Sequence, residues 1–169
     1  MKNIFIIIFS LLILSACKEE QELSSVNPIN WNKRTATIKP NNNLVSGASH
    51  LSVYSQIYSY TEHKKHGLTA TISIRNTDRK DTIYLNNASY YDTHGKLIRS
   101  YFKKPIYLIP METVEIVIDE TDKEGGTGGN FVFDWMIKPN RNEPLFEAVM
   151  ISTSGQQGLS FTTQGVKIH

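Results

Sequence analysis

The chain is poor in features on which many small stable proteins depend. It has a single cysteine, Cys17, among 169 residues. No disulfide can form within it, so the stability of the folded part must come from a packed core. Its only long apolar run, Ile4–Leu14, is interrupted by Ser10 and is shorter than the roughly 20 residues that a transmembrane helix needs. These shortages exclude a disulfide scaffold and a membrane-spanning helix in this run.

The chain also lacks a large excess of charge of either sign. The 18 basic residues are nearly balanced by 16 acidic ones, which gives a formal net charge of +2. Nucleic-acid-binding domains usually carry a basic stripe, and we therefore expect no nucleic-acid partner. A local polyanion-binding surface is an alternative, and it would be built from Lys33, Arg34, Lys39, Lys64 and Lys65.

Catalytic and zinc-binding motifs are missing as well. No Gly-x-Ser-x-Gly nucleophile elbow occurs. His63 and His66 stand three residues apart, but a closed zinc site needs four ligands, and the intervening Lys64 and Lys65 would repel a cation. We expect neither an enzyme nor a cofactor.

The first 16 residues have the layout of a secretory signal, with Lys2 before the apolar run and small residues after it. The sequence Leu14-Ser15-Ala16-Cys17 resembles the bacterial lipobox. That resemblance implies cleavage before Cys17 and acylation of its thiol and new amine, and two or three acyl chains anchor firmly. We expect a lipid-anchored protein of the bacterial envelope, at the outer membrane. The alternative is a plain secretory signal followed by an incidental cysteine.

Residues 17–43 are expected to form a flexible tether, because they are polar and rich in turn-forming residues. Trp31 and Ile38 are the residues in it that can dock on the domain. Lys18-Glu19-Glu20 resembles the signal that sends some bacterial lipoproteins to the outer surface, whereas an ordinary tether would leave the protein in the periplasm. Residues 44–169 then form one domain.

Apolar and polar residues alternate with period two through most of this domain, which is typical of strands. Turn-forming residues separate the alternating stretches. The pattern predicts an all-β, antiparallel sandwich of seven or eight strands, with the strand order left open. Two stretches, Arg75-Asn76-Thr77-Asp78 and Leu108-Ile109-Pro110-Met111-Glu112-Thr113, resemble bacterial immunoglobulin-like modules, so we expect an immunoglobulin-like sandwich, with a jelly roll as the alternative. The expected strands are 51–60, 68–75, 82–91, 96–102, 114–118, 131–137, 145–153 and 158–163.

Five stretches in order carry a family resemblance: Tyr54-Ser55-Gln56-Ile57-Tyr58, Ser73-Ile74-Arg75-Asn76-Thr77-Asp78, Tyr90-Tyr91-Asp92-Thr93-His94-Gly95, Gly125-Gly126-Thr127-Gly128-Gly129-Asn130-Phe131 and Gln157-Gly158-Leu159-Ser160-Phe161. They resemble a bacterial domain family of unknown function that occurs in small exported proteins and lipoproteins. The resemblance spans residues 50–163. It implies export and an all-β fold, and it implies no activity or catalytic residue.

The tyrosines of the expected 51–60 strand are the main candidates for a binding surface. Tyr54, Tyr58 and Tyr60 alternate with the apolar Leu51, Val53 and Ile57, so the pattern places the tyrosines together on the other face. Tyrosine offers a flat apolar ring with a polar tip, which suits protein interfaces and sugars. Tyr90-Tyr91, Tyr101 and Tyr107 would extend this surface. The alternative is a cross-strand ladder that only stabilises the sheet.

A glycine-rich loop supplies three further candidate contacts, Gly126, Gly128 and Asn130. The loop is not a phosphate-binding P-loop, because Asn130-Phe131 opens a strand where that motif needs Gly-Lys-Ser/Thr and a helix. Its glycines either allow a tight turn or bulge, or leave free amides that bind an anion or a carbonyl.

Three carboxylates just before this loop are weak candidates for calcium ligands. Glu120, Asp122 and Glu124 take positions 1, 3 and 5 of a calcium loop. However, Phe131 replaces the bidentate glutamate expected at position 12, and Lys123 has the wrong charge. The alternative is a solvated acidic turn.

Together these patterns predict a non-enzymatic binding or assembly module that acts through contacts with an envelope protein. The alternative is a lipoprotein that binds a small ligand, either a glycan or calcium.

Overall fold

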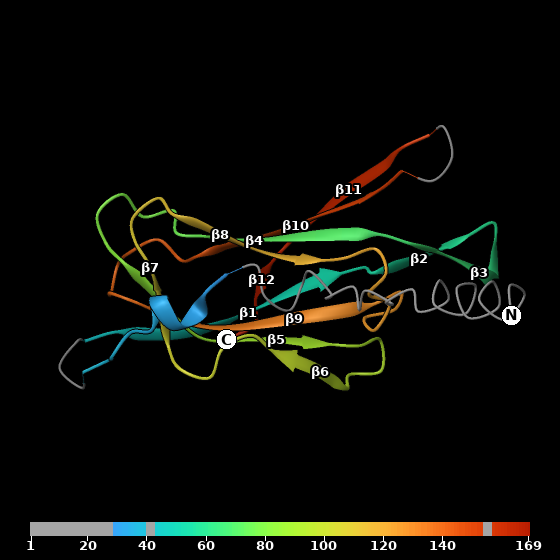
Figure 1. Ribbon diagram of the computed structural model, residues 1–169. Coiled ribbons are helices and arrows are strands. Elements are labelled where there is room, and N and C mark those ends of the chain that lie inside the picture. Colours follow the sequence, from blue (N-terminus) through green and yellow to red (C-terminus); the bar gives the residue numbers. More distant parts are fainter. Residues whose placement is uncertain (1–28, 40–42, 154–156) are drawn as a thin grey trace, which may run out of the picture.

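The computed structural model describes residues 29–39, 43–153 and 157–169 (Figure 1). These residues form strands and one short 3-10 turn, η2 (Trp31–Arg34), and among them there is no helix long and apolar enough to cross a membrane. The strands are β1 (Val45–Val53), β2 (Gln56–Ser59), β3 (Thr61–Gly67), β4 (Thr69–Arg75), β5 (Ile83–Tyr91), β6 (Leu97–Ser100), β7 (Ile106–Leu108), β8 (Thr113–Ile118), β9 (Gly129–Ile137), β10 (Leu145–Ser152), β11 (Leu159–Gln164) and β12 (Val166–Lys167).

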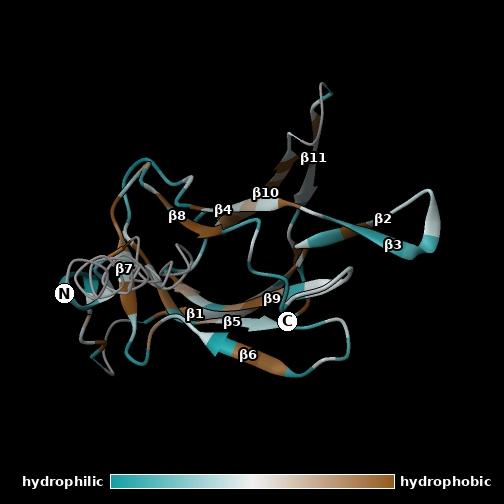
Figure 2. Ribbon diagram, turned by 45° about the vertical axis from the view of Figure 1, so that its right-hand side comes forward, coloured by the Kyte–Doolittle hydropathy of each residue, from teal (hydrophilic) through white to brown (hydrophobic). Residues whose placement is uncertain are grey.

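The strands form two antiparallel sheets and one separate hairpin. The first sheet has the order β12-β1-β9-β5-β6, with β7 also paired to β5, and the second has the order β11-β10-β4-β8. The hairpin joins β2 to β3. The two sheets pack face to face (Figure 2), and the predicted all-β sandwich is confirmed.

One apolar core fills the space between the sheets. Burial alternates residue by residue along β9, because successive side chains of a strand point to opposite faces. Phe133 of β9 stacks on Phe146 of β10 at a centroid separation of 4.2 Å, which joins the two sheets directly. Trp135 is also buried and donates a hydrogen bond from Nε1 to Ser49 Oγ at 3.0 Å. A buried indole N–H needs such an acceptor.

The expected strand 51–60 is not continuous. β1 ends at Val53, and a new strand begins at Gln56 after the buried Ser55. The backbone leaves the first sheet here because the amide of Gln56 donates to the carbonyl of Gly126 at 3.0 Å, and the carbonyl of Ser55 accepts from Leu68 at 2.9 Å. The segment His63–His66, which falls between the expected strands 51–60 and 68–75, is part of β3.

Two hairpins extend beyond the packed sheets, β2–β3 and the outer part of β10–β11 (Figure 1). The β3 strand is hydrophilic (Figure 2) and mostly exposed. β7 lies at the opposite end of the sandwich from β2–β3 in both views.

The segment that precedes β1 is packed against the β7 end. Trp31 packs on Phe102 with ring centroids 5.3 Å apart, Thr35 forms a β-bridge with Ile106, and the amide of Ala36 donates to the carbonyl of Pro105 at 2.7 Å. These residues fall inside the expected flexible tether, so at least this part of it, within residues 29–39, is packed on the domain. Cys17 and the signal lie outside the described residues.

Candidate functional site

The glycine-rich loop is fixed to the first sheet by polar contacts. Thr93, in the turn after β5, donates from Oγ1 to the carbonyl of Gly125 at 3.0 Å and accepts from the amide of Gly128 at 3.0 Å. The hydroxyl of Ser55 donates to the carbonyl of Gly126 at 3.2 Å. Three of the stretches that carried the family resemblance therefore meet at this loop.

The residues of this loop that were predicted to contact a ligand form hydrogen bonds within the protein. The amide of Gly126, whose φ is +66°, donates to the carbonyl of Lys123 at 3.1 Å. Asn130 donates to the carbonyl of Gly128 at 3.1 Å, and its Oδ1 lies 2.9 Å from His50 Nε2. The amides of Gly126 and Gly128 thus point to internal acceptors, which favours the conformational role of the glycines over the anion-binding one.

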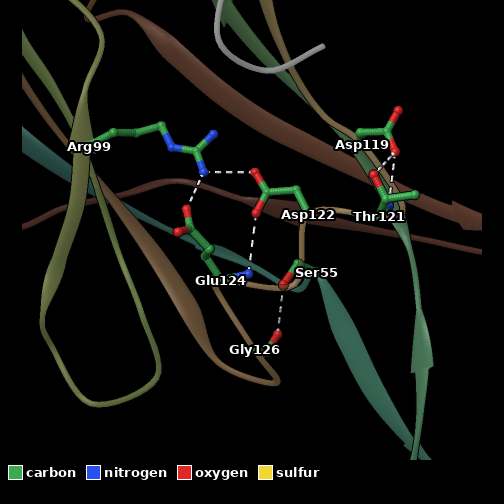
Figure 3. A network of polar contacts seen from close by, with 7 residues as sticks. All are labelled: Ser55, Arg99, Asp119, Thr121, Asp122, Glu124 and Gly126. Atoms are coloured by element: carbon green, nitrogen blue, oxygen red, sulfur yellow. Dashed lines mark hydrogen bonds and ion pairs between the residues drawn. The ribbon is translucent and has the colours of Figure 1, made fainter. Parts of the chain in front are cut away.

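The carboxylates before the loop meet an arginine (Figure 3). Nη2 of Arg99, on β6, lies 2.8 Å from Oδ2 of Asp122 and 2.5 Å from Oε2 of Glu124. The Asp122 side chain is fully buried, whereas that of Glu124 is 60% exposed. Burial by itself would lower the pKa of Arg99, but its electrostatic interactions with Tyr101 and Asp122 and its hydrogen bonds to both carboxylates outweigh burial and raise the pKa.

This arrangement argues against calcium binding by the three candidate carboxylates. Two of the three candidate ligands neutralise Arg99, and a guanidinium occupies the place where their oxygens converge. Within residues 29–39, 43–153 and 157–169, no group of three or more metal-ligating side chains is assembled. Asp122 and Glu124 therefore connect the segment before the glycine-rich loop to β6.

Two tyrosines expected to extend the exposed surface are instead packed beside Arg99. Tyr90 is fully buried and stacks on Phe131 at 4.7 Å, and Tyr101 stacks on the same ring at 5.6 Å. Both hydroxyl oxygens are buried without a hydrogen bond of ordinary geometry in the described part of the chain. Burial raises the pKa of Tyr90 to about 12, against the opposing effect of the nearby Ser55 hydroxyl. Tyr90 therefore does not widen the binding surface, whereas Tyr101 is half-buried and lines a cavity described below.

Tyr54, Tyr58 and Tyr60 do not share one strand face either, because the chain breaks between β1 and β2. Tyr54 is half-buried and packs edge-on against Phe161 at 5.8 Å. Tyr58 is 56% exposed, and Tyr60, at the tip of the hairpin, is 94% exposed. Only the latter two offer free surface.

Tyr58 and Tyr60 line a cleft of about 440 Å³ between the β2–β3 and β10–β11 hairpins. Its apolar lining includes Ile57 and Leu159, and Leu159 is 41% exposed. Lys64 Nζ lies 5.0 Å from the ring centroid of Tyr60. Lys65 Nζ, also on β3, lies 5.7 Å from the ring centroid of Tyr58. The cleft thus combines exposed aromatic and aliphatic surface with nearby cationic groups.

A serine and a histidine, which the sequence could not pair, also meet at this cleft. His66 Nε2 lies 2.5 Å from Ser152 Oγ, and both residues line the cavity. A histidine in such a pair acts as a base most effectively when a third group orients its other nitrogen. Among the described contacts of His66 there is no such carboxylate, and the pair links β3 to β10 across the cleft.

A larger cavity, of about 870 Å³, lies at the other end of the domain. It is lined by Trp31, Tyr101, Lys103 and Lys104, together with neighbouring residues of η2 and of the loop after β6. Sequence reasoning missed this site because its two walls are about 70 residues apart in the chain. The only available signal was the pair of adjacent lysines.

Fold and site together define an all-β, two-sheet sandwich protein with a hairpin-lined cleft. The chain belongs to the family described as Protein of unknown function (DUF3124), which matches residues 46–168. None of the curated proteins matches it. A solved structure titled "Crystal Structure of Thermotoga maritima 1070" is similar at 11% identity and a TM-score of 0.46, with 71% of this chain and 92% of that chain covered.

Proposed function

We propose that this protein is a lipid-anchored, non-enzymatic binding module of the bacterial envelope, held at the outer membrane through Cys17. Its partner is another envelope protein, which binds in the cleft between the β2–β3 and β10–β11 hairpins. The observation that carries the proposal is the exposure of Tyr58 and Tyr60 beside Ile57 and Leu159 in that cleft.

Large aromatic side chains that stay exposed at a concave site are typical of protein interfaces. Tyrosine buries much area for little loss of side-chain entropy, and it is enriched at interface hot spots. Tyr60 is also held at a φ of +63°, a conformation that costs a non-glycine residue free energy and is found more often at functional sites. These properties favour a binding role over a stabilising ladder.

The charges near the cleft indicate the chemistry of the partner. Lys64 and Lys65 are exposed and lie over the rings of Tyr60 and Tyr58. A partner that presents an apolar side chain next to carboxylates would bury the rings and meet the ammonium groups at the rim. Rim charges of this kind mainly set the rate of association and the choice of partner.

The anchor is tested separately from the cleft. In cells fed labelled palmitate, the wild-type protein should incorporate label and sediment with membranes, while Cys17→Ser should do neither. Label that persists in Cys17→Ser would overturn the anchor and leave the binding proposal untouched.

The cleft is tested by photocrosslinking of the full-length protein in intact cells. A photoreactive amino acid in place of Tyr58 or Tyr60 should give one discrete protease-sensitive adduct. The same probe at Met111, 63% exposed at the β7 end, should not give that adduct. Lys64→Gln/Lys65→Gln should weaken it, and Lys103→Gln/Lys104→Gln should leave it unchanged. Equal adducts from all three probe positions would contradict the proposal that the partner binds in the cleft. An adduct that is digested by glycosidases and not by proteases would show that the partner is a glycan and not a protein.

A further inference from the structure

We propose that the β7 end of the sandwich lies on an anionic lipid surface, and that the 870 Å³ cavity there receives a phosphate-bearing headgroup. This inference concerns a different surface from the partner-binding cleft. It uses the proposed lipid anchor at Cys17 in one respect, namely that the anchor holds the domain close to the membrane.

The cavity has an unbalanced cationic rim. Lys103 and Lys104 line it and are exposed. In the described part of the chain neither lysine makes an ion pair. Glu112 lines the neighbouring cavity, and its carboxylate is already paired with Arg34 at 2.7 Å. Adjacent unpaired lysines of this kind attract anionic headgroups.

A buried donor in the cavity wall supports a polar occupant. Trp31 lines the cavity, and its Nε1–H is buried without an acceptor among the described residues. A buried N–H that lacks a partner is unfavourable, so a small adjustment of the ring toward a phosphate oxygen would relieve it. Asn30 and Asn32 add further polar groups to the same wall.

Apolar side chains flank the cationic rim. Ile109 is 51% and Met111 63% exposed, and Met111 is held at a φ of +62° in the turn after β7. Ile109 lines a second cavity together with Lys33, and both cavities share Asn30, so the apolar turn and the lysines lie on either side of η2. Apolar tips surrounded by lysines are typical of surfaces that rest in a membrane interface.

The position of the anchor agrees with this orientation. Eleven residues, and therefore twelve Cα–Cα steps, separate Cys17 from Ile29, where the described chain begins. At about 3.5 Å per residue they span at most about 40 Å when fully extended. The β2–β3 hairpin lies at the opposite end of the domain (Figure 1), so an anchored molecule with its β7 end on the lipid presents the cleft away from the membrane.

The test uses the chain from Lys18 to His169, which keeps every described residue and carries no lipid. It should cosediment with vesicles of phosphatidylcholine and phosphatidylglycerol and not with phosphatidylcholine alone. Lys103→Gln/Lys104→Gln should weaken binding about 25-fold, about fivefold per lysine. Lys64→Gln/Lys65→Gln, which removes the same charge at the other end, should bind like the wild type. Equal losses in both double variants, or equal binding to neutral vesicles, would overturn the proposal.

Tryptophan fluorescence gives an independent readout of orientation. The chain has two tryptophans, and Trp135 is buried in the core, so quenching by brominated lipids should report Trp31 and disappear in Trp31→Phe. No quenching on bound vesicles would overturn the orientation. If free glycerol phosphate binds the chain at low concentration and vesicles do not bind, the ligand is a soluble phosphate and the membrane proposal fails. Neither result depends on acylation of Cys17.

Discussion

Nη2 of Arg99 lies 2.8 Å from Oδ2 of Asp122, and this ion pair joins β6 to the segment before the glycine-rich loop. Because the Asp122 side chain is fully buried, removal of the arginine would leave an uncompensated charge. We expect Arg99→Gln to lower the free energy of unfolding by about 3 kcal/mol. Glu124→Gln, which removes the exposed partner of the same arginine, should cost less than about 1 kcal/mol. Chemical denaturation of both variants measures this, and equal losses would contradict the assigned burial.

Gly125 and Tyr90 form a second testable pair. A Cβ atom on Gly125 would lie 1.8 Å from the Tyr90 hydroxyl oxygen and 2.7 Å from Cζ. Gly125→Ala should therefore cost about 2 kcal/mol. Tyr90→Phe removes a buried hydroxyl that has no hydrogen bond of ordinary geometry, so it should be neutral or stabilising by up to about 1 kcal/mol. In the Tyr90→Phe background Gly125→Ala should cost less than it does alone. Additive changes in this double-mutant cycle would refute the contact.

Glu112 should make stability depend on acidic pH. The hydrogen bond from Arg34 lowers the pKa of the Glu112 carboxyl. A lowered pKa means that the stabilisation is complete above the ordinary pKa of 4.5 and is lost as the pH falls through the lowered value. Glu112→Gln should cost about 1 kcal/mol at neutral pH, and the difference from the wild type should close as the pH falls below 4.5. Arg34→Gln should show the same pH dependence. The free energy of unfolding of the double variant should be only slightly lower than that of either single variant.

Calcium should leave the melting temperature unchanged. Arg99 already neutralises Asp122 and Glu124, and a divalent cation would have to displace a guanidinium from a partly buried site. Thermal unfolding in excess calcium chloride and in EDTA checks this. A rise of several degrees with calcium would restore the calcium hypothesis for Glu120, Asp122 and Glu124.

The tyrosines of the cleft should matter for binding and not for stability. Tyr58→Ala and Tyr60→Ala remove exposed side chains, so each should change the free energy of unfolding by less than about 0.5 kcal/mol. Both should reduce the crosslinked adduct in cells. A large loss of stability in Tyr58→Ala would favour the stabilising ladder instead.

Most of the strands could be predicted from the sequence. Alternation along 68–75, 82–91 and 131–137 corresponds closely to β4, β5 and β9, because a strand buried on one face must alternate in polarity. Three strands were not expected. β7 and β12 are three and two residues long, too short to show any period, and the seven-residue β3 is polar and mostly exposed, so it shows no apolar alternation. The structure therefore has more strands than the seven or eight expected.

The break at Ser55 could not be predicted. In residues 51–60, Ser55 and Ser59 interrupt the apolar face of the expected strand, but a polar residue alone does not predict a bend. The bend depends on hydrogen bonds to Gly126 and Leu68, which lie outside the expected strand. The candidate tyrosines were consequently divided between a packed position, Tyr54, and an exposed hairpin. Likewise, no local pattern brings Arg99 to Asp122, since the two lie on different elements.

The sequence by itself determined the fold class, the residues of the apolar core, and the candidate lipid attachment at Cys17. These features are local, because strand periodicity and a signal motif are written in consecutive residues. Tertiary structure alone decided which tyrosines stay exposed, which carboxylates are neutralised by Arg99, and where the cleft and the lysine-rimmed cavity lie. Each of these depends on side chains from distant strands, and their proximity is set by how the two sheets and their connecting loops pack.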